Sequence, residues 1–333
     1  MNTAPLPASF SPLTRTFRWP RSEQEQSQIN GTEQNPAEHR RALVLHGGGS
    51  AGNAWEIGVI AGLFNAGVDV TEADLIIGTS AGATATAQVT NASPTELLTA
   101  ILDAPSPQRG DPGRPSVGRP PMGPVIDHME RTNRIIAAAK DAADMRRRMG
   151  AAALEMDAAS DGSGQERWRA IVAARLPSHR WPERAILITA VDARNGKPVV
   201  FDRHSGVDLV DVVAASTANG FGVAPFGIGD VRFIDGGYRR NENADLAVGY
   251  ERVLVLSPFG GRSRHPDEWR MQLAAQVDEL RSTGSTVETI FPDRYSLDAF
   301  GSNMMDLSRR RPSALAGYEQ GMAHGERLTK FWC

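Results

Sequence analysis

Short apolar runs recur along the chain and alternate with longer stretches in which apolar residues return every three or four positions. The short runs have the length of buried strands, and the longer stretches have the period of amphipathic helices. Seven runs are predicted strands: Ala42–Leu45, Asp74–Ile77, Ala185–Val191, Pro198–Phe201, Val231–Ile234, Arg252–Leu256 and Val287–Phe291. Strands that alternate with helices predict an α/β fold, with three α/β/α layers around a mostly parallel sheet.

Two regions interrupt this alternation. Residues 1–39 are rich in Pro, Ser, Gln, Asn and Glu and are predicted to form a disordered tail, so the folded domain spans 40–333. Residues 104–124 hold seven prolines and predict a long surface loop. Residues 125–157 follow a helical pattern that aligns four side chains: Met145, Met149, Ala152 and Met156. That helix is either ordinary packing or a mobile cap for an acyl chain, and 104–165 is the predicted cap insertion.

Composition narrows the class of protein. With 333 residues and 41% hydrophobic content, the chain suits one large domain with additions or two small domains. A net charge of −3 gives no reason to expect nucleic-acid binding. The only cysteine is Cys333, which excludes a disulfide framework. No signal peptide or membrane-span pattern is present, so we expect a cytoplasmic protein, with peripheral membrane contact left open. No His, Asp or Cys cluster has ligand spacing, so neither a metal nor a cofactor is expected.

Three consecutive glycines, Gly47 to Gly49, follow the first predicted strand and precede a helical pattern. Such a turn exposes backbone N–H groups beside a helix N-terminus, where negative charge is favoured. A dinucleotide site, an oxyanion hole and a purely structural turn are the three interpretations. Gly47, Gly49 and Gly52 match G-x-G-x-x-G, but neither Asp69 nor Asp74 closes a second strand as a ribose-binding acid should.

The next predicted strand, Asp74–Ile77, runs into Gly-Thr-Ser-Ala-Gly at 78–82. This is the G-x-S-x-G pattern, which places a serine on a tight strand-to-helix turn with its hydroxyl exposed. Ser80 is therefore the candidate nucleophile. A nucleophile so close downstream favours the oxyanion-hole interpretation of the glycine turn.

A serine hydroxyl needs a base, and the sequence offers two arrangements. Asp298 and His324 would complete a Ser-Asp-His triad like that of hormone-sensitive-lipase-type α/β-hydrolases. Against this, only 34 residues separate His46 from Ser80, and His324 lies in a helical stretch. The alternative is Asp235, which ends a short predicted strand and is followed by two glycines that leave its carboxylate unobstructed.

Glycine turn, helix, strand, G-x-S-x-G and a distant Asp-Gly-Gly together resemble the patatin-like phospholipase family. The resemblance runs from about Arg41 to Pro258 and includes the stretches 214–237 and 243–258. It implies a serine ester hydrolase that cleaves fatty-acyl esters through an acyl-enzyme. It also implies that Ser80 is the nucleophile and that Asp235 is the general base. The oxyanion would be held by backbone N–H groups of the glycine turn: Gly47, Gly48, Gly49 and Ser50.

The chain departs from the family pattern at three places. Ala51 stands where many members carry Arg or Lys, which puts phospholipid preference in doubt. His46 replaces a Gly or Asp, and Ala218-Asn219-Gly220-Phe221 replaces the usual Ala-x-Pro-Gly. A non-catalytic member that binds a lipid or a protein through the same pocket is the second hypothesis. The head group, acyl chain and oligomeric state stay open.

Overall fold

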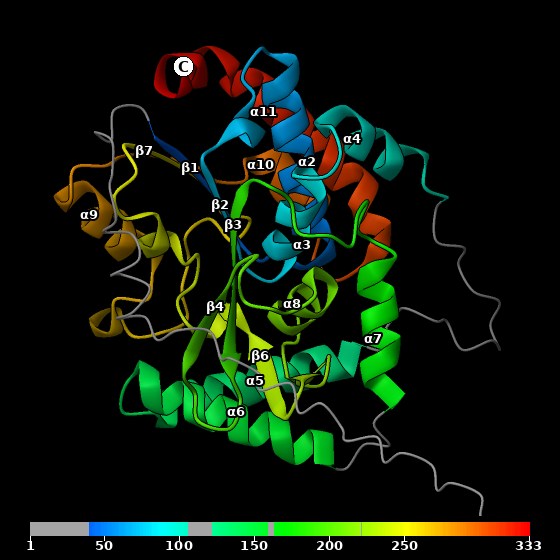
Figure 1. Cartoon of the computed structure of the whole chain (residues 1–333), viewed down its shortest axis with the longest axis vertical. Helices are drawn as coiled ribbons and strands as arrows, with labels where there is room; N and C mark the ends of the chain where they lie inside the picture. Colours follow the sequence, from blue (N-terminus) through cyan, green and yellow to red (C-terminus); the bar gives the residue numbers. More distant parts are fainter. Residues whose placement is uncertain (1–39, 106–121, 159–162, 221) are drawn as a thin grey trace, which may run out of the picture.

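The computed structural model describes residues 40–105, 122–158, 163–220 and 222–333, which form an eight-stranded sheet between helices (Figure 1). The strands are β1 (Arg41–Leu45), β2 (Leu75–Gly78), β3 (Ala185–Asp192), β4 (Pro198–Phe201), β5 (Phe226–Ile228), β6 (Val231–Asp235), β7 (Arg252–Leu256) and β8 (Thr286–Ile290). Their order is β5-β6-β3-β2-β1-β7-β8, and β4 pairs with β3.

All seven predicted strands are confirmed, each to within one residue at either end. β5 was not predicted, because three residues centred on a glycine give no readable alternation. Strands β3, β2, β1, β7 and β8 are parallel to one another, whereas β4 and β6 pair antiparallel with β3, and β5 with β6. The sheet is therefore mostly parallel, with an antiparallel end.

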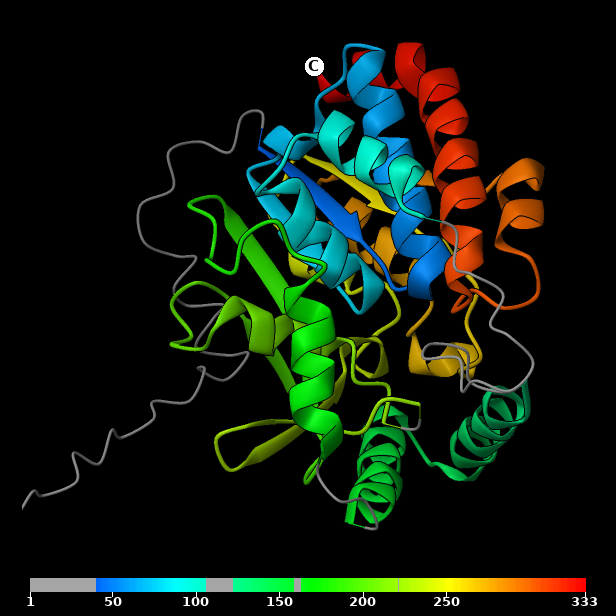
Figure 2. The same ribbon diagram turned by 90° about the vertical axis from the view of Figure 1, so that its right-hand side faces the viewer.

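Helices cover both faces of the sheet, as the alternating pattern predicts (Figure 2). One apolar cluster joins the sheet to α2 (Gly49–Asn65), α3 (Ala81–Val89), α4 (Pro94–Asp103), α7 (Ser163–Ala173), α8 (Leu209–Ser216), α10 (Arg294–Phe300) and α11 (Arg310–Trp332). The opposite face of β1, β2, β7 and β8 packs against α9 (Leu273–Ser282). A third cluster places α5 (Met122–Ala138) and α6 (Ala142–Ala158) against β3 and β6.

Helices α2 and α11 pack at backbone contact. A Cβ atom on Gly58 would overlap the carbonyl oxygen of Ala314, and one on Gly321 would overlap that of Val59. Gly62 and Gly317 make equally close approaches across the same interface. Because α11 and its neighbours cover it, α2 is buried on every side from Ala51 to Leu63, rather than on the single face that its pattern predicted.

The predicted cap region is only partly described. The tail 1–39 and most of the proline-rich loop, 106–121, lie outside the described residues. The single helix expected at 125–157 is two helices, α5 and α6, because residues 139–141 break it. Met145 and Met149 are fully buried on β3 and β6, whereas Met156 is exposed. That burial is ordinary packing, and movement of the region stays a prediction.

No helix in the described part of the chain is both long enough and apolar enough to cross a membrane.

Candidate active site

Ser80 sits on a sharp turn between β2 and α3. Its backbone has φ 55° and ψ −121°, a left-handed conformation that strains any residue with a side chain. The Ser80 N–H donates to the Ser216 hydroxyl (3.0 Å), which fixes the turn against the end of α8. The flanking Gly82 is required, because a Cβ there would overlap the Leu45 carbonyl at the end of β1. The strand-to-helix turn expected from G-x-S-x-G is therefore present.

Strand register brings Asp235 level with Ser80. Gly78 pairs with Ile188 on one side of β3, and Asp235 pairs with Ala190 on the other. Ser80 lies two residues beyond Gly78, and Ala190 lies two residues beyond Ile188, so Ser80 stands level with Ala190 and therefore with Asp235. The side chains of Ser80 and Asp235 meet across β3. Burial raises the pKa of Asp235 to about 6, while hydrogen bonds from the Ser80 hydroxyl and the Gly237 N–H act to lower it.

The glycine turn lies against the same serine. A Cβ on Gly47 would come within 2.9 Å of the Ser80 Cβ and 3.4 Å of its Oγ. Helix α2 begins at Gly49, which has φ 59°. The N–H groups of Ala51 and Gly52 donate to the Met304 and Gly48 carbonyls, both at 2.9 Å.

The N–H groups of Gly47, Gly48, Gly49 and Ser50 have no acceptor among the described residues. Those of Gly48, Gly49 and Ser50 lie at the start of α2, where backbone donors lack intrahelical partners. Free donors therefore adjoin the point at which Gly47 lies against Ser80.

Asn243 ties the nucleophile turn to the turn that carries the acid. It is fully buried, and its Nδ2 donates to Thr79 Oγ1 (2.9 Å), Thr189 Oγ1 (3.2 Å) and the Gly236 carbonyl (3.1 Å). Its Oδ1 accepts from Arg239 (2.8 Å). Thr79 precedes Ser80 and Gly236 follows Asp235, so one amide fixes the neighbours of both. Sequence reasoning missed Asn243, although it opens the stretch 243–258 that resembles the family.

Buried polar groups also gather where β1 and β7 end. The backbone N–H of His46 donates to the Leu256 carbonyl (3.3 Å). The imidazole ring of His46 packs edge-on against Phe259, at 5.7 Å between ring centroids. Burial lowers the pKa of His46 to about 3, so it stays neutral at ordinary pH. Glu242 accepts a hydrogen bond from Ser257 (2.9 Å), and burial raises its pKa to about 7. His46 therefore packs against Phe259 as a neutral imidazole.

The triad candidates lie elsewhere. His324 is on α11 and lines a cavity of about 530 Å³ with Asp293 and Tyr295 of the α10 region. Asp298 lies within α10, and no hydrogen bond or ion pair joins it to His324 in the described part of the chain. The structure thus brings neither residue to the Ser80 turn, in contrast with Asp235.

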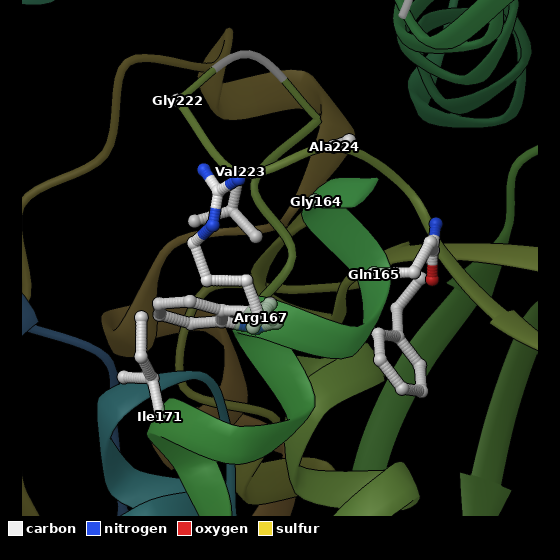
Figure 3. Close-up of a pocket in the computed structure, with 9 residues that line it drawn as sticks. Gly164, Gln165, Arg167, Ile171, Gly222, Val223 and Ala224 are labelled. Carbon is white, nitrogen blue, oxygen red and sulfur yellow. The ribbon is translucent and has the colours of Figure 1, made fainter. Parts of the chain in front are cut away.

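A second cavity, of about 180 Å³, lies between α7 and the loop at 222–226 (Figure 3). Trp168, Ile171 and Val223 make its lining largely apolar, and the Arg167 side chain extends over Val223. Neither Ser80 nor Asp235 lines it. The neighbouring Asn219, within the sequence 218–221 that departs from the family pattern, accepts N–H bonds from Gly222 (2.8 Å) and Val223 (3.0 Å) and so closes this loop.

The dinucleotide interpretation needs an acid near the glycine turn, and Asp74 does not lie there. Asp74 accepts a hydrogen bond from the Arg41 N–H (2.7 Å), which places it at the start of β1 and β2, the end opposite to the glycine turn. Among the residues that the structure describes, no group of three or more His, Cys, Asp or Glu side chains is placed to hold a metal ion.

Comparison with known proteins gives a family. The family model for patatin-like phospholipase matches residues 43–248. VipD from Legionella pneumophila aligns with 13% identity and a TM-score of 0.41, over 87% of this chain and 67% of that one. The type III effector ExoU aligns with 16% identity and a TM-score of 0.36, over 87% of this chain but 53% of its own. No curated protein sequence matches. Because the family model covers more than half of its length, the chain belongs to the patatin-like phospholipase family.

Proposed function

We propose that this protein is a lipid acyl hydrolase that cleaves fatty-acyl esters through a Ser80–Asp235 dyad. Family membership supports a lipid ester hydrolase. One observation carries the finer assignment: a strained serine faces an aspartate of raised pKa and lies beside free backbone donors. Perturbed acids that adjoin a nucleophile are typical of catalytic sites.

The reaction begins with proton transfer. Asp235 takes the proton of the Ser80 hydroxyl while Oγ forms a bond to the ester carbonyl carbon. A carboxylate is a weak base for an alcohol in water, but burial raises the proton affinity of Asp235, as its pKa of about 6 reflects. The tetrahedral intermediate collapses when the C–O bond to the leaving alcohol breaks, and the alcohol takes the proton from Asp235.

The glycine turn stabilises the negative oxygen. We assign the N–H groups of Gly48 and Gly49 as the principal donors, with Gly47 and Ser50 at the two ends of the same hole. Loss of one such donor costs about 3 kcal/mol, roughly a hundredfold in rate. Water then attacks the acyl-enzyme and gives one proton to Asp235. Asp235 passes this proton to Ser80 Oγ as the Oγ–acyl bond breaks and the fatty acid leaves.

The test compares p-nitrophenyl esters of graded chain length, together with labelling by a fluorophosphonate. Ser80→Ala and Asp235→Asn should each lose at least a thousandfold in kcat, and Ser80→Ala should not be labelled. His324→Ala and Asp298→Asn, which alter the unused triad candidates, should keep wild-type rates. A requirement for His324 would replace the dyad with a triad, and an inert, unlabelled wild type would favour a binding protein.

A further inference from the structure

The segment between α10 and α11 lies directly against the glycine turn. The Met304 carbonyl accepts the Ala51 N–H (2.9 Å), and Met305 Sδ lies 2.6 Å from the position that a Cβ on Gly49 would take. The Met305 N–H donates to Oδ1 of Asn303 (3.0 Å), which fixes the segment locally. A thioether sulfur therefore packs on a glycine whose N–H has no acceptor among the described residues.

Met305 is accessible from solvent, in contrast with the methionine before it. Met305 is 45% exposed, whereas Met304 is partly buried and packs against the main apolar cluster. Oxidation of methionine to its sulfoxide needs a small oxidant to reach the sulfur. Of the two methionines that touch the glycine turn, Met305 is therefore the one that such an oxidant can reach.

Three other methionines are exposed, and each of their sulfurs accepts a hydrogen bond from a side chain. The pairs are Met129 with Arg264 (3.7 Å), Met156 with Arg131 (2.8 Å) and Met322 with Asn65 (3.3 Å). In the described part of the chain, no donor bonds to the sulfur of Met305. A hydrogen bond occupies a lone pair of the sulfur, and the same lone pair must attack the oxidant. We therefore expect Met305 to react first among the exposed methionines.

We propose that Met305 is an oxidation site through which a peroxide closes the oxyanion hole. The sulfur lone pair attacks one peroxide oxygen and forms the S–O bond while the O–O bond breaks. The sulfur loses two electrons, the peroxide gains them, and its second oxygen leaves as water. The inference rests on the proposed function, because the hole is part of that function.

The new oxygen is the reason for inhibition. A sulfoxide oxygen is a strong hydrogen-bond acceptor, and here it forms beside the N–H groups of Gly48 and Gly49, which have none. Once bonded to the sulfoxide, these donors no longer stabilise the oxyanion. Because loss of one such donor costs about a hundredfold in rate, oxidation should lower kcat about tenfold or more with little change in KM.

The experiment is a hydrogen peroxide titration of the full chain. Cys333→Ser serves as the parent protein, because the exposed Cys333 thiol also reacts with peroxide. Mass spectrometry of peptides follows the oxygen gained by each methionine, and hydrolysis of a p-nitrophenyl ester follows kcat. The loss of kcat should track the oxidation of Met305, and methionine sulfoxide reductases should restore both.

Two further variants separate Met305 from the other methionines. Met305→Leu keeps an apolar side chain of similar volume and should retain its rate through the titration. Met322→Leu is the matched control, since Met322 is also exposed but lies beside Gly62 near the other end of α2. This variant should lose its rate as the parent protein does.

Two results overturn the proposal: Met305 is oxidised no sooner than Met322, or complete oxidation of Met305 leaves kcat intact. If Met305→Leu is inactive before treatment, the reductase experiment on the parent protein decides instead. Recovery of kcat in step with the reduction of Met305 supports the proposal, and recovery out of step contradicts it. A protein that is inert before treatment refutes the proposed function, while the order of oxidation still decides whether Met305 is the preferred site.

Discussion

Two groups of glycines admit close neighbours of different kinds in this protein. In the glycine turn, a Cβ on Gly47 would press on the Ser80 Cβ at 2.9 Å, and one on Gly48 would press on Pro258 at 2.7 Å. Gly58, Gly62, Gly317 and Gly321 remove side chains so that two helix backbones fill the space between them. In the first region missing side chains let a turn with free N–H donors lie directly against the serine, and in the second they let two helices lie directly against each other.

The two regions also differ in the interactions that stabilise them. The helix pair depends on close packing of backbones, whereas the turns that carry Ser80 and Asp235 depend on side-chain hydrogen bonds. Asn243 donates to Thr79 and Gly236, and Ser216 accepts from the N–H of the strained Ser80. Active sites commonly store strain and partly unpaired groups that the surrounding structure must support. We therefore expect substitutions in these turns to affect rate first, and substitutions at the helix pair to affect stability first.

Gly47→Ala should show the difference between the two regions most clearly, because it should lower the rate of hydrolysis with little change in stability. Its Cβ would press on the Ser80 Cβ at 2.9 Å and displace the nucleophile, and a misplacement of this size costs about a hundredfold or more in kcat. Ester hydrolysis and thermal unfolding measured together test this, with unfolding expected to change little. Gly164→Ala, where an added Cβ meets nothing within 4 Å, is the control. Full activity in Gly47→Ala would mean that the turn does not abut the nucleophile.

Asn243→Ala should affect both the rate of hydrolysis and the stability, because the Asn243 amide joins the turn that carries Ser80 to the turn that carries Asp235. Lost partners for Thr79, Gly236 and Arg239 should lower the unfolding free energy by about 2–3 kcal/mol. Activity should fall as well. Asn243 has φ 58°, so Asn243→Gly tolerates the backbone while still removing the amide. If the glycine variant matched wild type in denaturant titration and in rate, the amide would have no positioning role.

At the helix pair, Gly321→Ala and Gly58→Ala should each lower the unfolding free energy by about 1–2 kcal/mol. Backbone overlap costs about 1–3 kcal/mol, and the better helix propensity of alanine offsets part of it. Activity of the folded variants should stay within about twofold of wild type. Chemical denaturation and active-site titration provide the measurement. A large loss of rate without loss of stability would contradict the expectation that the helix pair affects stability first.

The smallest effect is the acid limb of the pH profile. Asp235 must be ionised to act as base, so with a pKa of about 6 the value of kcat/KM at pH 5 should be about a tenth of its plateau. His46→Gln should leave the midpoint in place, since the pKa of His46 lies near 3. A midpoint that moved with His46 would assign the titration to the imidazole.

The same pKa has a consequence for stability. The protonated form of Asp235 is favoured on folding, so its contribution is present below the ordinary value of 3.8 and is lost as pH rises through about 6. Asp235→Asn should therefore gain stability relative to wild type at pH 8, on the order of 3 kcal/mol, and little at pH 4. Thermal unfolding at the two pH values measures the difference.

The sequence by itself determined seven of the eight strands, the turns that carry Ser80 and Asp235, and the family. These are local features: an apolar run of four to eight residues, a G-x-S-x-G turn, and an aspartate before two glycines. Each is specified by neighbours along the chain. The assignment of Ser80 and Asp235 to one dyad still came from resemblance, because nothing in either turn measures the distance between them.

The tertiary structure decided which distant residues meet. Sheet order places β6 beside β3, so that Asp235 reaches Ser80, and the close packing of α11 on α2 brings Arg310 to the turn that lacks a cation at Ala51. In the basic run at 309–311, Arg310 and Arg311 both bind backbone carbonyls of distant elements. Periodicity tells which face of an element is buried but not what buries it, because partners are chosen by packing between elements far apart in the chain.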